Sequence, residues 1–280
     1  MAKRSNGYGP KTFNHYCQAF EQLAEWLTKS GKVASNPVPG LPRRNNEEDV
    51  RKRRRALTTE EVGKLIESAR NSTEQIQCFD GETRARIYLI AYLTGLRRSE
   101  IGSLTPENFQ LDASPPTVTI AATISKHRRT DVLPLHPELV SLVREWIKGF
   151  EASEKLFPRL AKRKTWKMVK KDLERAGIPY KTHEGDADFH AAGRHTHISG
   201  LFRTGASNTQ ARELARHSDM KTTLRYTHVG LMEKAKAVAA LPVPWQRSGS
   251  DLAAIWSSRT GKVSQQATPP VLQNRRKDQM

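Results

Sequence analysis

Residues 188–230, near the C-terminal end, constrain the fold of this chain more than any other stretch. Apolar residues at helical spacing follow Arg194, and Gly205 predicts the end of that helix. A second helix is expected to end at His217, and a third, shorter helix is expected to carry Tyr226. These polar side chains thus stand at the ends of elements, where they can converge on one pocket.

An arginine, a histidine and a tyrosine in one pocket are suited to attack on a phosphodiester. A free tyrosine is a poor nucleophile near neutral pH because its pKa is about 10. Cations make it useful when they stabilise both the phenolate and the charge that develops on the target. Arginine suits a phosphate target, since its planar fork binds two oxygens at once and keeps its charge. A second arginine is therefore expected elsewhere in the chain.

The second arginine is found upstream, in the sequence AYLTGLRRSEIGSLTPENFQLD at residues 91–112. A helix that ends at Thr94 and Gly95 predicts a tight turn at Arg97. Glu100, three residues later, can pair with an arginine or cap the next turn. Structural ion pairing with Glu100 is the alternative to a catalytic role for Arg97.

These motifs resemble the tyrosine recombinases, also called phage-type integrases, over residues 57–241. The family pattern is T-G-x-R-x-x-E, then H-x-x-R-H-T, then a histidine or tryptophan, then a tyrosine. The resemblance implies a mainly α fold with a small β-hairpin or sheet, of the α+β class. It also implies a site-specific recombinase of mobile elements, which cleaves and rejoins double-stranded DNA and works as a homo-tetramer on two DNA sites.

The resemblance assigns roles to the matching residues. Arg97 and Arg194 would clamp the two non-bridging oxygens of the scissile phosphate, and His217 would hydrogen-bond a phosphate oxygen. Tyr226 would be the nucleophile, forming a 3′-phosphotyrosyl bond that stores the energy for rejoining. The alternatives are a histidine that only stabilises the end of its helix and a buried structural tyrosine.

Residues 117–135 change to a β-rich pattern with a basic tip, which predicts a hairpin or the edge of a small sheet. In the family this hairpin carries a catalytic lysine, and alignment on the closing apolar-Pro-Leu places it at Lys126. The alkoxide that leaves DNA needs a proton, which a lysine with a pKa lowered by nearby arginines can supply. The alternative is a basic turn in which Lys126, His127, Arg128 and Arg129 bind phosphate.

His190 departs from the family spacing, because the sequence HAAGR at residues 190–194 is one residue longer than H-x-x-R. One extra residue rotates a side chain by about 100° if a helix absorbs it. A bulge or loop at Gly193 would instead keep His190 in place for acid–base work. Otherwise Ala191 would occupy the histidine position. The neighbouring His195 is interpreted as structural.

The composition favours a polyanionic partner. Lysine and arginine number 47 against 29 aspartates and glutamates, a formal net charge of +18, which most simply indicates nucleic acid. No apolar run approaches the length of a membrane span and no signal peptide is visible, so a cytoplasmic protein without membrane contact is expected. The two isolated cysteines form no metal motif, and arginine, lysine and histidine can supply the charge that metals supply elsewhere. No metal or other cofactor is therefore expected.

Composition and the resemblance divide the chain into four parts. An amphipathic helix over residues 11–29 cannot bury its apolar stripe alone, so the core-binding domain is expected either to lack its N-terminal portion or to rely on another packing partner. The expected parts are a partial helical core-binding domain (1–44), a basic linker (45–56), the catalytic domain (57–241) and a disordered tail (242–280).

The basic linker contains Arg51, Arg53 and Arg54. These side chains either contact the DNA backbone as the chain passes round the duplex or form a solvated charge run. The sequence alone leaves both interpretations open.

Two further functions fit the charge. The long His190 spacing and the short N-terminus are consistent with a recombinase remnant that binds DNA without cutting it. A type IB topoisomerase shares the tyrosine chemistry. A covalent DNA adduct that is lost in Tyr226→Phe separates an enzyme from a remnant, and relaxation of supercoiled DNA without partner sites would favour a topoisomerase.

Overall fold

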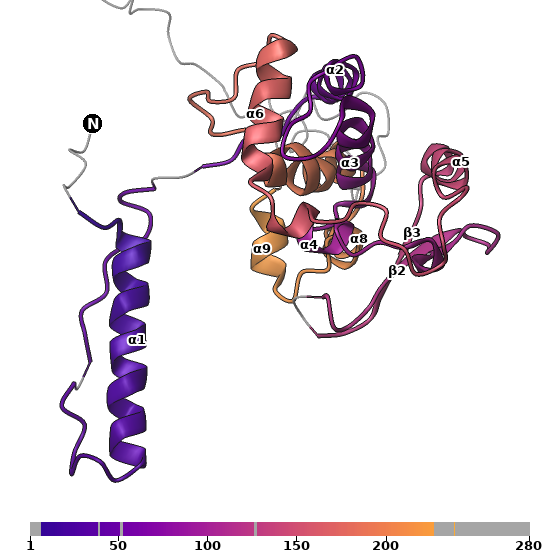
Figure 1. The fold of residues 1–280 in the computed structure, drawn as a ribbon. Coiled ribbons are helices and arrows are strands. Elements are labelled where there is room, and N and C mark those ends of the chain that lie inside the picture. Colours follow the sequence, from indigo (N-terminus) through magenta and orange to yellow (C-terminus); the bar gives the residue numbers. More distant parts are fainter. Residues whose placement is uncertain (1–6, 39, 51–52, 126–127, 227–237, 239–280) are drawn as a thin grey trace, which may run out of the picture. The chain divides into compact units, whose positions relative to one another are not determined.

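The computed structural model of the chain describes residues 7–38, 40–50, 53–125, 128–226 and 238. Arg51, Lys126 and the whole of the expected tail therefore lie outside the described residues. The fold is mainly helical with a small sheet, which confirms the expected class (Figure 1). The helices are α1 (Pro10–Lys29), α2 (Thr59–Arg70), α3 (Gly81–Thr94), α4 (Arg98–Ile101), η1 (Pro106–Asn108), α5 (Pro137–Trp146), η2 (Leu160–Lys162), α6 (Thr165–Arg175), η3 (Ala191–His195), α7 (Thr196–Arg203), α8 (Asn208–Ala215) and α9 (Met220–Leu224).

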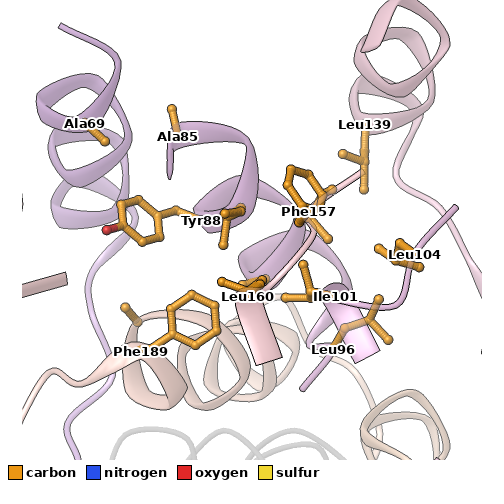
Figure 2. Close-up of a cluster of buried hydrophobic side chains, with 14 of the residues drawn as sticks. Ala69, Ala85, Tyr88, Leu96, Ile101, Leu104, Leu139, Phe157, Leu160 and Phe189 are labelled. Carbon is orange, nitrogen blue, oxygen red and sulfur yellow. The ribbon is translucent and has the colours of Figure 1, made fainter. Parts of the chain in front are cut away.

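Helix α3 packs among other helices and contacts α2, α4, η3 and α7. Its buried residues lie on more than one face, as expected for a helix that is surrounded by others. Figure 2 shows Tyr88 of α3 in the same buried cluster as Phe189 and Leu160. This helix leads directly to Arg97, and it also supports the segment that carries Arg194.

The ends of the first catalytic helices are set by local hydrogen bonds. Thr58 Oγ1 accepts from the Glu61 N–H at 3.1 Å, and the Glu61 carboxylate accepts from the Thr58 N–H at 2.9 Å. This reciprocal pair is a capping box at the start of α2. Asp80 caps α3 by accepting from the Thr83 N–H at 2.8 Å. Leu57, just ahead of α2, is fully buried.

The sheet contains β1 (Phe109–Gln110), β2 (Thr117–Ile120) and β3 (Asp131–Pro134), in that order and antiparallel. Val118 of β2 is opposite Leu133 of β3, and both are buried, so one face of the hairpin joins the core. The expected hairpin over residues 117–135 is confirmed. The short strand β1 was not expected from the sequence.

A buried ion pair joins α3 to α6. Arg84 donates to both carboxylate oxygens of Asp172, from Nε at 2.8 Å and from Nη2 at 3.1 Å, and both side chains are fully buried. The Tyr88 hydroxyl donates to Asp172 Oδ2 at 2.7 Å. Burial and the Asp172 charge hold the pKa of Tyr88 well above its ordinary value, so this hydroxyl remains a hydrogen-bond donor.

Helix α1 leaves much of its apolar stripe exposed. Its small residues Cys17 and Ala24 are buried, while Tyr16, Phe20 and Leu23 stay at least half exposed. The chain after α1 returns along the helix, and Asn14 Nδ2 donates to the Arg44 carbonyl at 2.7 Å. The apolar stripe therefore has little cover among the described residues.

The last residues of the expected linker make hydrogen bonds to the expected catalytic domain. The Asp186 N–H donates to the Arg53 carbonyl at 2.9 Å, and the Arg55 N–H donates to the Asp186 carbonyl at 3.3 Å. Arg55 is buried and forms an ion pair with Glu61 at 2.9 Å. Within the described residues, no helix has the length and apolar character needed to cross a membrane.

Candidate active site

The end of helix α3 positions the first candidate arginine. Gly95 ends α3 with a φ of 63°, and a Cβ at this position would lie 2.6 Å from His197 Cδ2. Glycine accepts both this left-handed turn and the close approach. Arg97 follows as the N-cap residue of α4. The turn between α3 and α4 thereby fixes where the Arg97 side chain leaves the backbone.

Glu100 orients Arg97. Its carboxylate accepts from the Arg97 backbone N–H at 2.7 Å and from Arg97 Nη1 at 3.0 Å. The ion pair that the sequence offered as the structural alternative is therefore present. The Arg97 side chain is still 21% exposed, whereas Glu100 is fully buried. An arginine that is held on one side and exposed on the other is suited to bind an anion.

The second candidate, Arg194, does not begin a helix as the sequence predicted. It lies within η3, a π-helical turn over Ala191–His195 that leads directly into α7. The Thr196 N–H donates to the Ala191 carbonyl, the longer bond that defines a π-turn. A π-turn closes one residue later than an α-turn. The extra residue between His190 and Arg194 thus lies within a turn that is wider than an α-turn.

Two contacts hold this π-turn in place. A Cβ on Gly193 would lie 2.7 Å from Ala91 Cβ, so glycine lets η3 pack closely against α3. Asp188 caps the turn, because its Oδ1 accepts from the Ala191 N–H at 3.0 Å. Of the possibilities that the sequence left open, the bulge that includes Gly193 is the one found. Such π-turns occur frequently at functional sites.

Arg194 is almost completely buried and ties two segments together. Its Nη1 donates to the Gly95 carbonyl at 2.9 Å, and its Nη2 donates to the Ala215 carbonyl. Burial, with the charges of Arg97 and Arg216, lowers the pKa of Arg194 to about 10. The guanidinium therefore remains charged at neutral pH, and it lies between the end of α3 and the end of α8.

Tyr226 lies beside two histidine rings. Helix α9 ends at Leu224, so Tyr226 stands in the turn after it and not within the third helix, as had been predicted. Its ring centroid is 4.7 Å from that of His195 and 6.0 Å from that of His217. His217 in turn makes a 2.9 Å hydrogen bond through Nδ1 to Thr223 Oγ1. The histidine after α8 and the tyrosine after α9 are thus brought together.

The charges around the Tyr226 phenol oppose the effect of burial. Burial raises the pKa of Tyr226, while the positive charges of Arg194, Arg54, Arg225 and Arg97 act to lower it. The net shift is upward, so the phenol is protonated in the free protein at neutral pH. Deprotonation therefore needs a proton acceptor together with these cations.

His190 is largely withdrawn from solvent. Burial, with the charges of Arg54 and Arg194, lowers the pKa of His190 to about 4, so the imidazole is neutral at neutral pH. Its Nδ1 is buried and has no hydrogen-bond partner within the part of the chain that the structure describes. A neutral imidazole next to cations can accept a proton once an anion balances those cations.

The residues expected to bind DNA are only partly described. Arg53 and Arg128 are exposed. Arg54 Nε contacts both oxygens of Asp188 at 2.9 Å. Arg129 Nε contacts Asp131 at 3.0 Å, with the arginine side chain 57% exposed.

Sequence reasoning missed Arg216, and it did not connect Arg54 or His195 with Tyr226. Arg216, beside His217, is 2% exposed and donates to Glu100, the partner of Arg97. Arg54 comes from the linker, yet its charge acts on Tyr226. His195, interpreted as structural, lies against the Tyr226 ring. These contacts join residues that are far apart in the sequence, so local sequence patterns cannot predict them.

No metal site accompanies these groups in the described part of the chain, where no three His, Cys, Asp or Glu side chains are arranged to hold an ion. The candidate site is instead cationic. Arg97, Arg194 and Arg54 all act electrostatically on Tyr226. Such an arrangement suits a phosphate ester, because it stabilises both the anionic target and a developing phenolate.

Comparison with known proteins gives the same family as the sequence motifs. A model described as the phage integrase family matches residues 55–231. The protein named tyrosine recombinase XerC from Xylella fastidiosa (strain M23) is 26% identical over 246 residues, which cover 85% of this chain and 77% of that protein. Tyrosine recombinase XerD from Listeria monocytogenes serovar 1/2a is 25% identical over 241 residues, which cover 81% of this chain and 74% of that protein.

Solved structures share the fold at low sequence identity. The XerH site-specific recombinase in a post-cleavage complex with a palindromic difH substrate has a TM-score of 0.62 at 19% identity, covering 85% of this chain and 69% of that one. The Tn1549 transposon integrase in complex with transposon right end DNA also has a TM-score of 0.62, at 17% identity, covering 84% of this chain and 81% of that one.

The family model spans more than half of the chain and covers Arg97, Arg194 and Tyr226. The family and the named relatives support site-specific recombination, in preference to a non-cleaving remnant or a type IB topoisomerase. The chain belongs to the phage integrase family, the tyrosine recombinases, which cleave and rejoin DNA.

Proposed function

We propose that this recombinase uses Tyr226 as its nucleophile, with Arg97 and Arg194 as the clamp on the scissile phosphate. The main support for this proposal is that segments far apart in the sequence come together around Tyr226. The charges of both arginines act on the Tyr226 phenol, and the tyrosine ring lies against His217. His217 would then hydrogen-bond a phosphate oxygen at the same site.

In the proposed cleavage step the Tyr226 oxygen attacks the phosphorus, and the bond from phosphorus to the 5′-oxygen breaks. The phenol proton passes to His190, which is neutral at neutral pH. A bound phosphate balances the charges of Arg54 and Arg194 that hold down the His190 pKa, so imidazole becomes a better base when substrate is present. The leaving 5′-oxygen takes its proton from Lys126, which lies outside the described residues.

Rejoining reverses these bonds. A 5′-hydroxyl of a partner strand attacks the 3′-phosphotyrosyl ester, and the Tyr226 oxygen leaves. The ester keeps the energy of the original phosphodiester, so the reaction needs no high-energy cofactor. We propose that four copies assemble on two double-stranded sites, as the tyrosine-recombinase resemblance implies, and that the protein works wherever the cell's DNA is held.

The remaining basic residues are proposed to bind the DNA backbone. Arg53 and Arg128 are exposed, whereas Arg54 and Arg129 also pair with acidic residues of the site. Arg51 is proposed for the same role and lies outside the described residues. Arg53→Ala and Arg128→Ala should each reduce the slope of log binding constant against log salt by about one. An unchanged slope in both variants would remove these residues from the interface.

The test of the nucleophile is covalent trapping on nicked DNA duplexes, in which the short leaving strand diffuses away after cleavage. A duplex library is used, because the target sequence is unknown. The parent should form a protein–DNA adduct that survives denaturation. Tyr226→Phe should form none, because it removes only the attacking oxygen.

Tyr92→Phe is the matched control, since it removes a phenol oxygen from a tyrosine that packs against the hydrophobic core. This variant should form adduct at the parent rate. An adduct that persists in Tyr226→Phe, or the absence of any adduct from the parent across the library, would overturn the proposed function.

A further inference from the structure

Arg216 occupies a backbone conformation that an arginine rarely adopts. It follows the last residue of α8 with φ 53° and ψ 48°, in the left-handed region. A residue with a Cβ loses about 1–2 kcal/mol there, and glycine is the residue that avoids this cost. Its side chain is nonetheless 2% exposed. A strained and buried arginine next to His217 needs a physical reason.

The Arg216 guanidinium contacts two buried carboxylates. Its Nη2 donates to Glu100 Oε2 at 2.6 Å, and its Nη1 lies 3.4 Å from Asp131 Oδ2. Its Nε is buried without a hydrogen-bond partner in the described part of the chain. An unpaired buried donor costs about 1–3 kcal/mol. The position is therefore a poor choice for stability alone.

Glu100 connects Arg216 to the phosphate clamp. The same carboxylate that accepts from Arg216 also accepts from the backbone and the side chain of Arg97. Burial alone would raise the pKa of Glu100, but the hydrogen bond and charge of Arg216, together with Arg97, hold this pKa below its ordinary value. Glu100 is thus an anion shared by two arginines. Without Arg216 its charge would act on Arg97 alone and weaken the pull of Arg97 on a phosphate.

Asp131 connects Arg216 to the tip of the β2–β3 hairpin. Asp131 begins β3, and its carboxylate accepts from Ser125 Oγ at 3.2 Å and from Arg129 Nε at 3.0 Å. Ser125 and Arg129 stand on either side of the hairpin tip. The Arg216 side chain therefore connects the turn at Arg97 with the hairpin. The next residue in the chain is His217.

We propose that Arg216 is a positioning residue for the recombination reaction. Because Arg216 shares the negative charge of Glu100, that charge does not act on Arg97 alone. Arg97 therefore keeps its attraction for the phosphate and its orientation towards it. Through Asp131, Arg216 also holds Ser125 and Arg129 of the hairpin relative to the clamp. This inference rests on the proposed function, because it assigns Arg216 an effect on the phosphate that Tyr226 attacks.

The test compares Arg216→Lys and Arg216→Gly on two nicked duplexes. One duplex has a normal scissile phosphate, and the other has a methylphosphonate, in which a methyl group replaces a non-bridging oxygen and removes the charge. Lysine keeps the charge but cannot fork between two carboxylates. Glycine suits the backbone but makes neither contact. Both variants should form the Tyr226 adduct about 10- to 100-fold more slowly on the normal phosphate.

The methylphosphonate distinguishes positioning from general damage to the fold. A neutral target depends less on the charge of Arg97, so the loss should shrink at least several-fold for both Arg216 variants and for Arg97→Lys. Arg84→Lys is the matched control, because Arg84 is also fully buried against a carboxylate but belongs to the contact between α3 and α6. It should lower the melting temperature while the adduct rate of folded protein stays at the parent value on both duplexes.

The possible failures are distinguishable. If the parent forms no Tyr226-dependent adduct, the proposed function fails and the role of Arg216 fails with it. If the parent reacts and both Arg216 variants match its rate, only the inference is overturned. It is also overturned if the variants lose the same factor on both duplexes, or if neither variant folds, because Arg216 would then serve the fold alone.

Discussion

Arg84 and Arg216 are both buried and both form ion pairs with carboxylates, but their backbone conformations and hydrogen bonding differ. Arg84 belongs to the regular helix α3 and forms a two-point contact with Asp172, and its remaining nitrogen donates to the Glu74 and Phe79 carbonyls. Arg216 has a left-handed backbone, contacts two carboxylates from separate segments and leaves its buried Nε without a partner in the described part of the chain.

The difference shows what each network is suited to do. The Arg84 network satisfies its polar groups within a regular backbone, which is the arrangement that stabilises a fold. The Arg216 network accepts strain and an unsatisfied donor next to His217 and Arg97, and stored strain of this kind is typical of functional sites. Substitutions in the Arg84 network should therefore lower stability without slowing the reaction, and substitutions around Arg216 should slow the reaction.

The largest expected effect on stability is in the Arg84 network. Asp172→Ala removes the acceptor of Arg84 and of the Tyr88 hydroxyl. A buried arginine without its partner should lower the free energy of unfolding by about 3–5 kcal/mol. Denaturant titration measures this loss, and the adduct rate of the protein that remains folded should not change. A loss below about 1 kcal/mol would show that the pair does not support the fold.

The next effect should combine stability with reactivity. Gly193→Ala places a methyl group 2.7 Å from Ala91 Cβ, which forces η3 away from α3. Overpacking of this kind costs about 1–3 kcal/mol, and it moves His190 and Arg194 together. Both the free energy of unfolding and the rate of adduct formation should therefore fall.

Gly200→Ala is the matched control for Gly193→Ala. Gly200 lies in α7, and a Cβ there meets no atom within 4 Å. Alanine should stabilise the helix by up to about 1 kcal/mol and leave the rate unchanged. If Gly193→Ala behaves like Gly200→Ala, the close packing of the π-turn is unimportant.

A smaller effect on stability depends on pH and arises from His197, which lies near the positive charges of Arg194 and Arg216. Burial, with the charges of Arg194 and Arg216, lowers the pKa of His197 from 6.5 to about 4 despite its hydrogen bond to the Tyr92 carbonyl. The unfolded chain therefore binds a proton below pH 6.5, whereas the folded protein does so only near pH 4. Stability from this group is complete above pH 6.5 and is lost as the pH falls towards 4.

His197→Asn keeps a hydrogen-bond donor for the Tyr92 carbonyl and removes the titration. Thermal melts between pH 4 and 6.5 should show a shallower decline than in the parent, with the contribution of His190 remaining. An identical decline in both proteins would mean that His197 is not the group responsible.

The smallest effect is expected for an exposed ion pair. Arg144 contacts Asp112 at 2.8 Å, with side chains that are 49% and 87% exposed. Arg144→Ala should lower the free energy of unfolding by less than about 1 kcal/mol, and salt should weaken even this effect. A larger loss of stability in low salt would mean that this exposed pair stabilises the fold as much as a buried ion pair does.

The sequence predicts the regular helices well, because their apolar spacing and their glycine ends are local signals. Gly95 ends α3 where the pattern T-G-x-R places it, and Gly205 follows α7. The hairpin is likewise visible in the change to a two-residue period. The arginines of the motifs and Tyr226 could be chosen for the same reason, since each stands in a short pattern with a chemical meaning.

Local patterns could not predict how the site is supported. The wide turn at η3 depends on the fit of Gly193 against Ala91, which lies in a helix far away in the sequence. The pairing of Arg216 with Glu100 joins residues 116 positions apart. The apolar stripe of α1 is visible in the sequence, but the sequence does not show that the returning chain leaves Tyr16, Phe20 and Leu23 exposed.

The Tyr226 oxygen is the proposed covalent link between the protein and DNA. Trypsin digestion of the trapped adduct, followed by mass spectrometry, tests it directly, because cleavage after Arg225 and Lys234 releases the peptide of residues 226–234. This peptide should carry the cleaved DNA strand through a 3′-phosphate on its first residue, Tyr226. DNA on any other peptide, or none on this one, would contradict the proposed link.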